Sequence, residues 1–393
     1  MVHRLGSRQQ AGRHAISSSA AGAPGILASA PPPANLGNVR RTQPKTDRPN
    51  VAQSYTAVAQ VVRESGLLTR TRWFYALLLG GLALALGGAA TGFILLGDSW
   101  YQLLIAGALG IIFTQIAFVA HEASHRAVFT SGPHNDRLGR TLATALVGIS
   151  YAWWMNKHSR HHANPNRVGK DPDIDFDTIS FTEEDAAKQK GLMAWITRRQ
   201  GYLFFPLLLL EGVNLHVTSV RTLFARRRIE GRGLELSLIA ARFVVYFGVI
   251  FWFLPLGMAF AFIGVQLAVF GVYMGASFAP NHKGMPIVPA DSKLDFFSKQ
   301  VLTSRNIIGG WWATTLYGGL NHQVEHHLFP SMPRTHLSKA RRIVKEHCAT
   351  VGVPYTEATV PASYGIVVNY LNRVGLAARD PFDCPMVDRF RRT

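Results

Sequence analysis

The stretch WFYALLLGGLALALGGAATGFILLGDSWYQLLIAGALGIIFTQIAFVA, residues 73–120, decides the fold of this chain. Its 48 residues include one charged side chain, Asp98, which lies in the short sequence Gly97-Asp98-Ser99. The segments on either side, Trp73–Leu96 and Trp100–Ala120, would form helices about 36 Å and about 31 Å long. Both lengths are sufficient to cross a hydrocarbon core of about 30 Å. The stretch therefore predicts a transmembrane hairpin.

A second block, residues 243–281, contains no charged side chain. Pro255 divides it, and we expect one helix from about Leu234 to Leu254 and another from Leu256 to about Ala279. Arg242 falls inside the first of these helices, where we expect it to pair or to reach toward the nearer membrane surface. The two blocks together predict an all-α integral membrane protein with four transmembrane helices in two hairpins.

Charge is concentrated outside these two blocks. The 393 residues include 41 Lys and Arg against 23 Asp and Glu, a formal net charge of +18, although only 16% of residues are charged. Such an excess in a soluble protein would suggest nucleic-acid binding, but the long uncharged blocks exclude that class and we expect no nucleic-acid partner. Basic residues flank the helix ends opposite Gly97–Ser99 and Pro255. The positive-inside rule therefore predicts that both termini and the 121–233 segment are cytoplasmic.

The remaining sequence predicts three regions: a disordered N-terminal arm, 1–50, a membrane domain, 51–370, and a C-terminal tail, 371–393. The arm is rich in Ala, Ser, Pro and Arg, so an organelle-targeting peptide is the alternative interpretation. We expect Tyr55–Arg70 to form a short helix that leads into the membrane. Leu142–Met155 and Phe204–Val220 are expected to be helices that lie at the membrane surface.

Histidines gather in three short motifs, His121-Glu-Ala-Ser-His125, His158-Ser-Arg-His161-His162 and Gln323-Val-Glu-His326-His327. Residues three and four apart share one face of a helix, so each motif can direct its imidazoles together. The first motif follows the second predicted span, and His282 follows the fourth. The chain has only two cysteines and no paired CxxC spacing, which argues against a disulfide framework, an iron–sulfur cluster or a cysteine-built zinc site. The motifs predict a metal site built from imidazoles.

Eight imidazoles at one membrane surface would suit two metal ions. The candidate ligands are His121, His125, His158, His161, His162, His282, His326 and His327. Gln323 occupies the first slot of the third motif and could bind a metal directly, through water, or only contact a ligand, while His322 is an alternative at this position. We interpret the remaining histidines as structural or solvated: His3, His14, His134, His216, His336 and His347.

The three motifs, their order and the local sequence Gly318–Pro330 resemble the membrane-bound fatty acid desaturase family over about residues 55–370. The chain is most similar to the acyl-lipid and front-end branch, in which the third motif begins with Gln. The resemblance implies a cytoplasmic helical cap with a non-haem di-iron centre held by the eight candidate histidines. It also implies O2-dependent desaturation of a fatty acyl-CoA or acyl-lipid. Electrons would come from a ferredoxin or a flavoprotein–cytochrome donor.

Further residues are assigned roles around this centre. Asn281 is a candidate for holding a bridging water, and carboxylates after the second motif could accept the outer N–H of ligating imidazoles: Asp171, Asp173 and Asp175. Four tryptophans are candidates for the wall of an acyl tunnel or, alternatively, for membrane anchors: Trp153, Trp154, Trp311 and Trp312. We interpret three basic segments as a surface for an anionic head group, the anionic leaflet or an acidic electron donor: Arg221–Arg232, Arg334 and Arg341–Lys345.

Other activities share parts of this pattern. A membrane hydroxylase or ketolase would use the same histidine motifs and differ only in what happens to the second hydrogen. The sequence His121-Glu122-Ala-Ser-His125 also matches the H-E-x-x-H of zinc proteases, with Glu122 as the general base. An intramembrane protease would leave the other clustered histidines unexplained. A non-catalytic membrane receptor that keeps the three motifs to bind zinc is a further alternative.

Overall fold

The computed structural model describes residues 51–378, except for 176–177 and 227. Contacts divide the chain into residues 1–39 and 40–393, and all described residues belong to the second part. The arm predicted over residues 1–50, and the tail beyond residue 378, lie outside the described residues.

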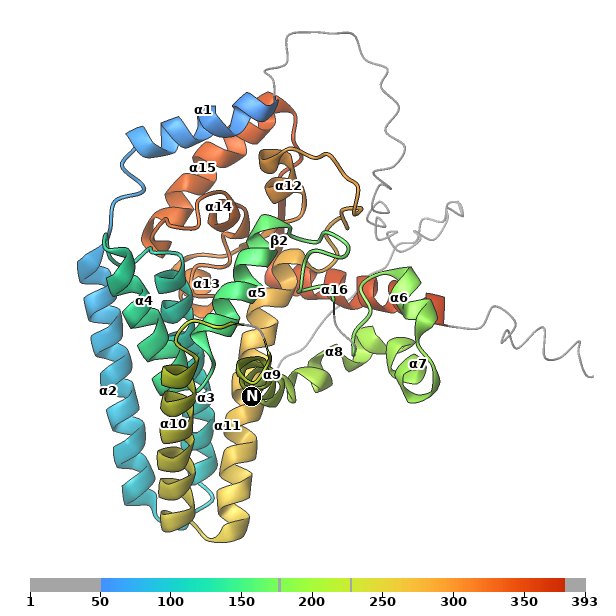
Figure 1. The fold of residues 1–393 in the computed structure, drawn as a ribbon. Helices are drawn as coiled ribbons and strands as arrows, with labels where there is room; N and C mark the ends of the chain where they lie inside the picture. The colour runs from blue at the N-terminus through green and yellow to red at the C-terminus, as the bar shows by residue number, and fades with distance from the viewer. Residues whose placement is uncertain (1–50, 176–177, 227, 379–393) are drawn as a thin grey trace, which may run out of the picture. The chain divides into compact units, whose positions relative to one another are not determined.

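Four long helices run side by side and form the membrane part of the protein: α2 Arg72–Leu96, α3 Gln102–Ser124, α10 Arg232–Phe253 and α11 Leu256–His282 (Figure 1). Among the described helices these are the ones long and apolar enough to cross a membrane, and the bent pair α8–α9 would add a fifth if it formed a single span. This result confirms the all-α fold with four apolar helices in two hairpins. The break near Pro255 is also confirmed, because α11 begins at the next residue.

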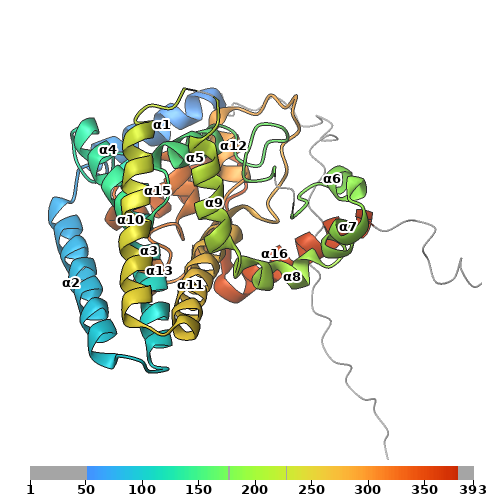
Figure 2. The ribbon, with the colours of Figure 1, turned by 60° about the horizontal axis from the view of Figure 1, so that its bottom comes forward.

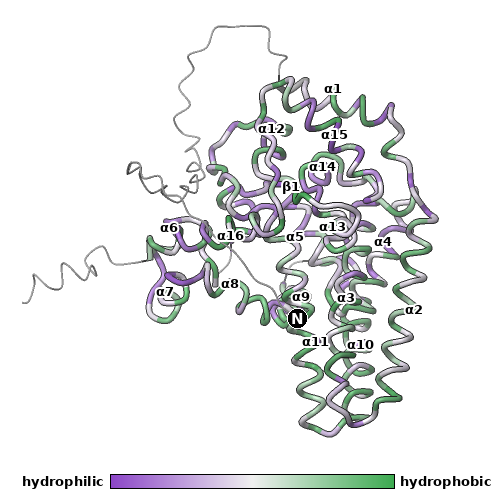
Figure 3. The backbone as a smooth tube through the Cα atoms, turned by 180° about the vertical axis from the view of Figure 1, so that it is seen from behind, coloured by the Kyte–Doolittle hydropathy of each residue, from purple (hydrophilic) through white to green (hydrophobic). Residues whose placement is uncertain are grey.

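Helices α2 and α10 present apolar side chains outward. The leucines at 77, 84 and 95 of α2 are 76%, 79% and 80% exposed, respectively. A continuous apolar surface of this kind is unfavourable in contact with water, but it is favourable in contact with the hydrocarbon core of a bilayer. The tube coloured by hydropathy shows the same contrast between the apolar bundle and the more polar elements at its other end (Figure 3).

Helices α3 and α11 form the centre of the bundle and pack closely against each other. A side chain at Gly110 of α3 would place its Cβ 2.9 Å from the carbonyl oxygen of Gln266, so only glycine permits this approach. Gly212 and Gly271 allow a comparable contact with α9, Glu211–Leu223. Small residues at helix crossings are typical of membrane proteins, because they let backbones approach.

Short helices cap one end of this bundle. They comprise α1 Val51–Glu64, α4 Gly132–Arg140, α5 Tyr151–Ala163, α12 Phe296–Leu302, α13 Trp311–Leu316, α14 Gln323–Leu328, α15 Arg334–Val351 and α16 Val360–Gly375 (Figure 1). Strands β1 Arg305–Ile308 and β2 Thr356–Thr359 pair in parallel, with Arg305 opposite Thr356. Helix α16 ends at Gly375, and the short 3-10 helix η3, Leu376–Ala378, follows it.

A lateral group of helices lies beside α11 and α16: α6 Glu183–Lys188, α7 Gly191–Thr197, α8 Gln200–Leu208 and α9 (Figure 2). The single helix predicted over Phe204–Val220 is wrong, because the chain bends by 74° between α8 and α9. Pro206 lies near the end of α8, and at the break the N–H groups of Leu209 and Leu210 donate to the carbonyl oxygens of Pro206 and Leu207, three residues earlier.

The single helix predicted over Leu142–Met155 is also divided. A π-helix, η2 Thr141–Val147, ends at Gly148, whose φ of +94° stops the ladder. Ser150 then caps α5 by accepting a hydrogen bond from the N–H of Trp153 at 3.0 Å. The predicted helix over Tyr55–Arg70 likewise ends earlier, at Glu64.

Arg242 pairs with groups inside the bundle. It lies ten residues after the start of α10, and its Nε donates to the carbonyl oxygen of Leu146 in η2 at 2.7 Å. Its guanidinium also lies over the rings of Phe113 and Tyr246. The pairing expected from the sequence is therefore made with a backbone carbonyl and aromatic faces.

Candidate metal centre

Four helix segments bring the predicted ligands together at one end of the bundle. His121 lies in the last turn of α3 and His125 follows that helix directly. Helix α5 carries the three histidines of the second motif, and α14 carries the two of the third. His282 is the last residue of α11. All eight candidate ligands therefore come from helices that meet at this point.

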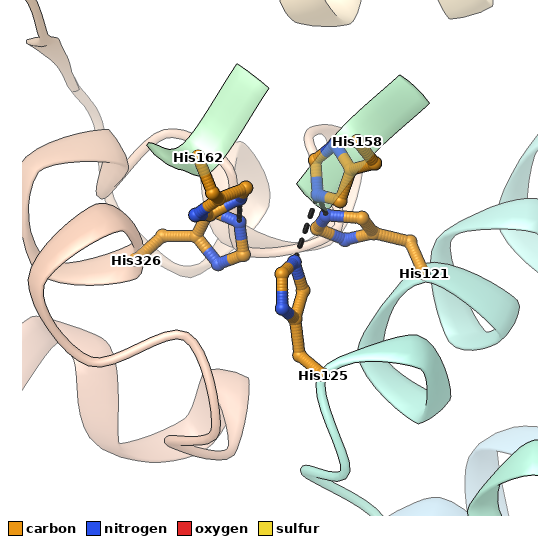
Figure 4. Close-up of side chains that lie close together, drawn as sticks. All are labelled: His121, His125, His158, His162 and His326. Atoms are coloured by element: carbon orange, nitrogen blue, oxygen red, sulfur yellow. Dashed lines mark hydrogen bonds between the residues drawn. The ribbon is translucent and has the colours of Figure 1, made fainter. Parts of the chain in front are cut away.

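Five of these imidazoles form one group, which we call the five-histidine cluster: His121, His125, His158, His162 and His326. Their ligand atoms all lie within 4.8 Å of one another. Nε2 of His158 is 2.8 Å from Nε2 of both His121 and His125. Nε2 of His162 is 3.1 Å from Nε2 of His326. Figure 4 shows the five rings directed toward a common centre.

The other three form the three-histidine cluster: His161, His282 and His327. Nε2 of His161 lies 3.3 Å from Nε2 of His282. The two clusters are adjacent, since the rings of His162 and His327 stack with their centroids 4.2 Å apart. The eight candidate ligands thus divide into two neighbouring sets of five and three.

The outer nitrogen of each ring in the three-histidine cluster has a partner. Nδ1 of His161 lies 3.0 Å from Oδ1 of Asp171, and Nδ1 of His282 lies 2.8 Å from the carbonyl oxygen of Thr303. Nδ1 of His327 lies 2.8 Å from Oε1 of Gln300. These acceptors fix the tautomer, so each Nε2 presents its lone pair to the interior of the cluster. Nε2 of His327 has no hydrogen-bond partner among the described residues.

Burial lowers the pKa of several of these imidazoles. It lowers the pKa of His125 to about 3. Burial, followed by the neighbouring imidazoles, lowers the pKa of His158 and of His326 well below the ordinary histidine value. A neutral imidazole has a lone pair that can bind a metal, whereas an imidazolium has none.

The donor set fits transition-metal ions. Lone pairs that face each other at 2.8 Å repel unless a proton or a cation lies between them, and a neutral ring carries only one proton for two nitrogens. Two ions would satisfy the converging nitrogens of both clusters. Imidazole nitrogens suit iron, copper and zinc, and the described residues bring no thiolate into either cluster.

Gln323 and Asn281 lie at the edge of the three-histidine cluster. Nε2 of Gln323 is 2.8 Å from Nε2 of His282, and its Oε1 accepts a hydrogen bond from Nδ2 of Asn281 at 3.1 Å. Both side chains are buried. The side-chain oxygen of Asn281 has no partner among the residues that the structure describes. His322 is buried beside the motif but joins neither cluster.

The three aspartates after the second motif differ in position. Asp171 is buried, contacts His161 and accepts hydrogen bonds from the backbone N–H groups of Asn166 and Asp173. Asp173 lies 3.5 Å from Nδ1 of His161 and forms an ion pair with Lys157. Asp175 is exposed and does not belong to these groups.

Glu122 does not have the surroundings of a protease base. It is buried and accepts hydrogen bonds from Nε of Arg334 at 2.9 Å, from Nη2 of the same side chain, and from the hydroxyl of Tyr75 at 2.8 Å. These donors hold the carboxylate in a buried ion pair with Arg334, and Glu122 belongs to neither histidine cluster. The interpretation of HEASH as a protease motif therefore has no support from the geometry.

The same contact corrects the interpretation of Arg334 as a surface cation. Its side chain is buried because it neutralises Glu122 in the interior. Arg341 and Lys345, by contrast, are both paired with Glu357 on the outside of α15. Arg342 remains an exposed cation of the predicted basic segment.

The tryptophan pairs have different surroundings. Trp153 is buried, and the ring of Trp154 stacks on that of His158 with a centroid distance of 4.9 Å. Both line a small apolar cavity next to His121. Trp311 and Trp312 are 82% and 46% exposed. This exposure agrees with membrane anchoring and disagrees with a place in a tunnel wall.

A larger cavity, of about 310 Å³, reaches the metal ligands from the side. His158, His161, His282 and Gln323 form its inner end, and apolar side chains of α8, α9 and α11 form much of the rest. We call this space the lateral cavity. Trp154, Leu215, Met274 and Phe278 line both the lateral cavity and the small cavity beside His121.

Sequence reasoning missed two residues that orient the ligands. Gln300 contacts His327 through its oxygen and donates from Nε2 to the carbonyl oxygen of His162 at 2.8 Å. The carbonyl group of Thr303 contacts His282. Gln300 lies near the end of α12 and Thr303 is the residue after this helix, so both are distant in sequence from every histidine motif. A single glutamine and a backbone carbonyl carry no spacing signal.

A bundle of four apolar helices with two clusters of imidazoles at one end has the features of a membrane protein that could hold metal ions. Comparison with known families identifies which kind. The family model for fatty acid desaturases matches residues 98–359. The chain belongs to the fatty acid desaturase family, whose members are oxidoreductases of lipid metabolism.

Curated relatives include front-end desaturases. A Delta(8)-fatty-acid desaturase of Helianthus annuus is 27% identical over 345 residues, which cover 84% of this chain and 75% of the relative. An acyl-lipid (9-3)-desaturase of Physcomitrium patens is 27% identical over 356 residues, which cover 88% of this chain and 66% of the relative. The Delta(6)-fatty-acid desaturase fat-3 of Caenorhabditis elegans is 28% identical over 320 residues, which cover 78% of this chain and 71% of the relative.

Proposed function

We propose that this protein is an O2-dependent fatty acyl desaturase that uses a non-haem di-iron centre. In this reaction two neighbouring C–H bonds break and a C=C bond forms. The substrate gives up two electrons and two protons, and an external donor gives two more electrons. With two further protons taken up from the solvent, O2 leaves as two molecules of water. The observation that supports the proposal is the pair of histidine clusters, from which His158, His161 and His282 line a largely apolar cavity.

We assign one iron to the five-histidine cluster and one to the three-histidine cluster, with Gln323 beside the second. Two iron ions bound there would supply the activation of O2 that removal of hydrogen from an unactivated methylene requires. The protein's own share is to bury the imidazoles and to hold them oriented. Asp171, Gln300 and the Thr303 carbonyl perform the second task through the outer nitrogens.

The acyl chain would occupy the lateral cavity. Met274 and Phe278 of α11 and Leu215 of α9 line this cavity and the smaller one beside His121. An alkyl chain that follows both cavities passes His158 and His282, which belong to different clusters. Apolar walls hold the chain straight and exclude water, so only the methylenes next to the clusters can react.

Replacement of the proposed ligands tests this function. His158→Ala and His326→Ala should each abolish the new double bond and lower the iron content, while the variants still insert into the membrane. The measurement combines mass spectrometry of lipids from an expressing host with metal analysis of the purified protein. His134→Ala, a histidine outside both clusters, is the control and should retain activity.

The same lipid analysis separates the alternatives. A loss of two hydrogens from an acyl chain supports desaturation, and a gain of one oxygen would show a hydroxylase instead. Normal product from either ligand variant would refute the proposed site. Both termini and the metal centre are proposed to face the cytoplasm, where a ferredoxin or a flavoprotein–cytochrome donor can reach the capping helices.

A further inference from the structure

We infer that the acyl chain enters the lateral cavity directly from the bilayer, carried by a membrane lipid whose head group has no net charge, and not as a CoA thioester. This inference rests on the proposed function and decides between the two carriers that it leaves open. Its support comes from where the cavity opens and from the charges that line it.

Three residues of the cavity lining are exposed, Thr178, Leu210 and Asn214, and we place the opening for the lipid at the bend between α8 and α9. Leu210 and Asn214 lie at this bend. Around the opening the same two helices expose further apolar side chains: Tyr202 75%, Phe205 39%, Leu209 49%, Val213 44% and Val217 48%. An apolar rim of this extent belongs in contact with lipid rather than with water.

The helices that form the rim pack against the membrane bundle. Helix α9 contacts α11 closely through Gly212 and Gly271, and α8 also packs on α11 (Figure 2). A lipid beside α11 therefore meets the opening without leaving the bilayer. A CoA thioester, whose large head group requires water, would have to cross the apolar rim first.

The charges of the cavity wall balance. Lys157 and Lys283 are opposed by Asp173 and Glu211, so the four charged side chains have a formal net charge of zero. Lys157 forms an ion pair with the carboxylate of Asp173. Lys283 donates a hydrogen bond to the backbone carbonyl oxygen of Asp173, and its ammonium group lies over the ring of Phe181. Both cations therefore already have partners in the protein.

Glu211 places a negative charge near the opening. It is the first residue of α9 and accepts a hydrogen bond from Nδ2 of Asn214 at 3.0 Å. A polyanionic head group would be repelled by this carboxylate and would find no unpaired cation among the four charged side chains. A zwitterionic head group can place its cationic part toward Glu211 and its phosphate away from it.

Photolabelling of the full-length iron-loaded protein in detergent micelles tests the inference. The probe is phosphatidylcholine with a diazirine in one acyl chain. We expect label on the α11 peptide that contains Met274, a buried side chain of the cavity wall. Unlabelled phosphatidylcholine should compete at least tenfold better than an acyl-CoA of the same chain. Equal or better competition by the acyl-CoA would overturn the inference.

A matched pair of variants tests the opening itself. Leu210→Trp fills the rim and should reduce labelling of the Met274 peptide at least fivefold. Leu209→Trp changes the neighbouring exposed leucine, which does not line the cavity, and should leave labelling unchanged. An equal effect of both variants would show that the chain enters elsewhere.

Charge reversal tests the selectivity for the head group. Glu211→Lys removes the negative charge at the opening and adds a positive one, so an acyl-CoA should compete at least threefold better than in the unchanged protein. No change would overturn the charge argument. Since labelling requires no turnover, a protein that takes up phosphatidylcholine but forms no double bond refutes the proposed function and leaves this inference standing.

Discussion

Gln300 shows how a residue outside every motif can organise the metal centre. Its side chain is fully buried and holds His327 through one atom and the backbone of His162 through the other. It therefore connects the third histidine motif with the second. Partners of this kind set ring orientation and basicity, and their loss typically weakens metal binding.

We predict that Gln300→Leu lowers the affinity of the three-histidine cluster for iron by roughly 10-fold to 100-fold. The reason is that Nδ1 of His327 loses its acceptor and the ring is free to turn. Titration of the iron-free protein with ferrous ion, followed by metal analysis, measures the change. Phe296→Ala, on the exposed side of the same helix, is the control. Unchanged affinity in Gln300→Leu would refute the orienting role.

Cys348 allows a test of pH dependence away from the metal centre. It is fully buried on α15, and burial, reinforced by Glu325, raises the pKa of its thiol to about 12. An ordinary thiol has a pKa of about 8.5 and becomes a reactive thiolate as the pH rises through that value. Cys348 should stay protonated over the same range.

In a Cys384→Ser background, the alkylation rate of Cys348 by N-ethylmaleimide should therefore remain low and nearly constant between about pH 7 and about pH 9. The same thiol should react rapidly once the protein is unfolded in dodecyl sulfate, with a rate that rises with pH. Mass spectrometry of the α15 peptide measures both rates. A steep rise in the folded protein would show that the thiol is accessible and ionises normally.

At the scale of single residues, the spacing of the histidines and the ends of the predicted spans led to the prediction that eight imidazoles meet at one level, and the structure brings these eight into two adjacent clusters. Helical periodicity relates residues within a motif, and the ends of the predicted spans relate the motifs to each other. The division into clusters of five and three was not predictable, because it depends on how α5 and α14 are turned. The burial of Arg334 was not predictable either, since its partner Glu122 is 212 residues away.

At the scale of elements, long apolar helices were predictable and broken ones were not. The four long helices agree with the apolar blocks within a few residues, because length and hydropathy are properties of a continuous segment. The break at Gly148 depends on a single residue within apolar sequence, and the bend between α8 and α9 likewise falls within apolar sequence. The sequence Leu142–Met155 offers no periodic signal for a π-helix, which uses a different hydrogen-bond register.

Gly148 is the element-scale position whose replacement has the clearest expected cost. Its φ of +94° lies in a region that side chains with Cβ avoid, so Gly148→Ala should lower the free energy of unfolding by about 1–2 kcal/mol. Because Gly148 lies between η2 and α5, the change should also reduce iron retention. Unfolding in dodecyl sulfate, followed by circular dichroism, provides the stability measurement.

Gly87→Ala is the matched control. Gly87 lies inside α2 with a helical backbone, and an added Cβ would meet no atom within 4 Å. Alanine should leave stability unchanged or raise it by about 0.5–1 kcal/mol, since it is the better helix former. Equal losses in the two variants would show that backbone conformation at Gly148 is not the cause.

At the scale of the whole molecule, the distribution of charge predicts a direction in the membrane. Asp98, between α2 and α3, and Asp291, between α11 and α12, are both exposed and lie at opposite ends of the bundle. The basic residues surround the end that carries the histidine clusters. The positive-inside rule therefore assigns Asp291 to the cytoplasm and Asp98 to the other side.

Single cysteines introduced at these positions, in a Cys384→Ser background, test the assignment. A membrane-impermeant maleimide should label Asp98→Cys in intact cells and Asp291→Cys only after permeabilisation. Cys348 is buried and should contribute no label in either case. The reverse pattern would place the metal centre outside the cytoplasm.

The wide separation of the histidines along the chain determines the order of events during synthesis. His121 leaves the ribosome about 200 residues before His327, and every cluster includes residues from both early and late segments. Neither cluster can be complete until the last hairpin has been inserted and α14 has been made. Under the proposed function, iron is therefore taken up by a chain that is already anchored in the bilayer. A cell short of iron would accumulate full-length, membrane-inserted protein that recovers activity without new translation when the metal returns.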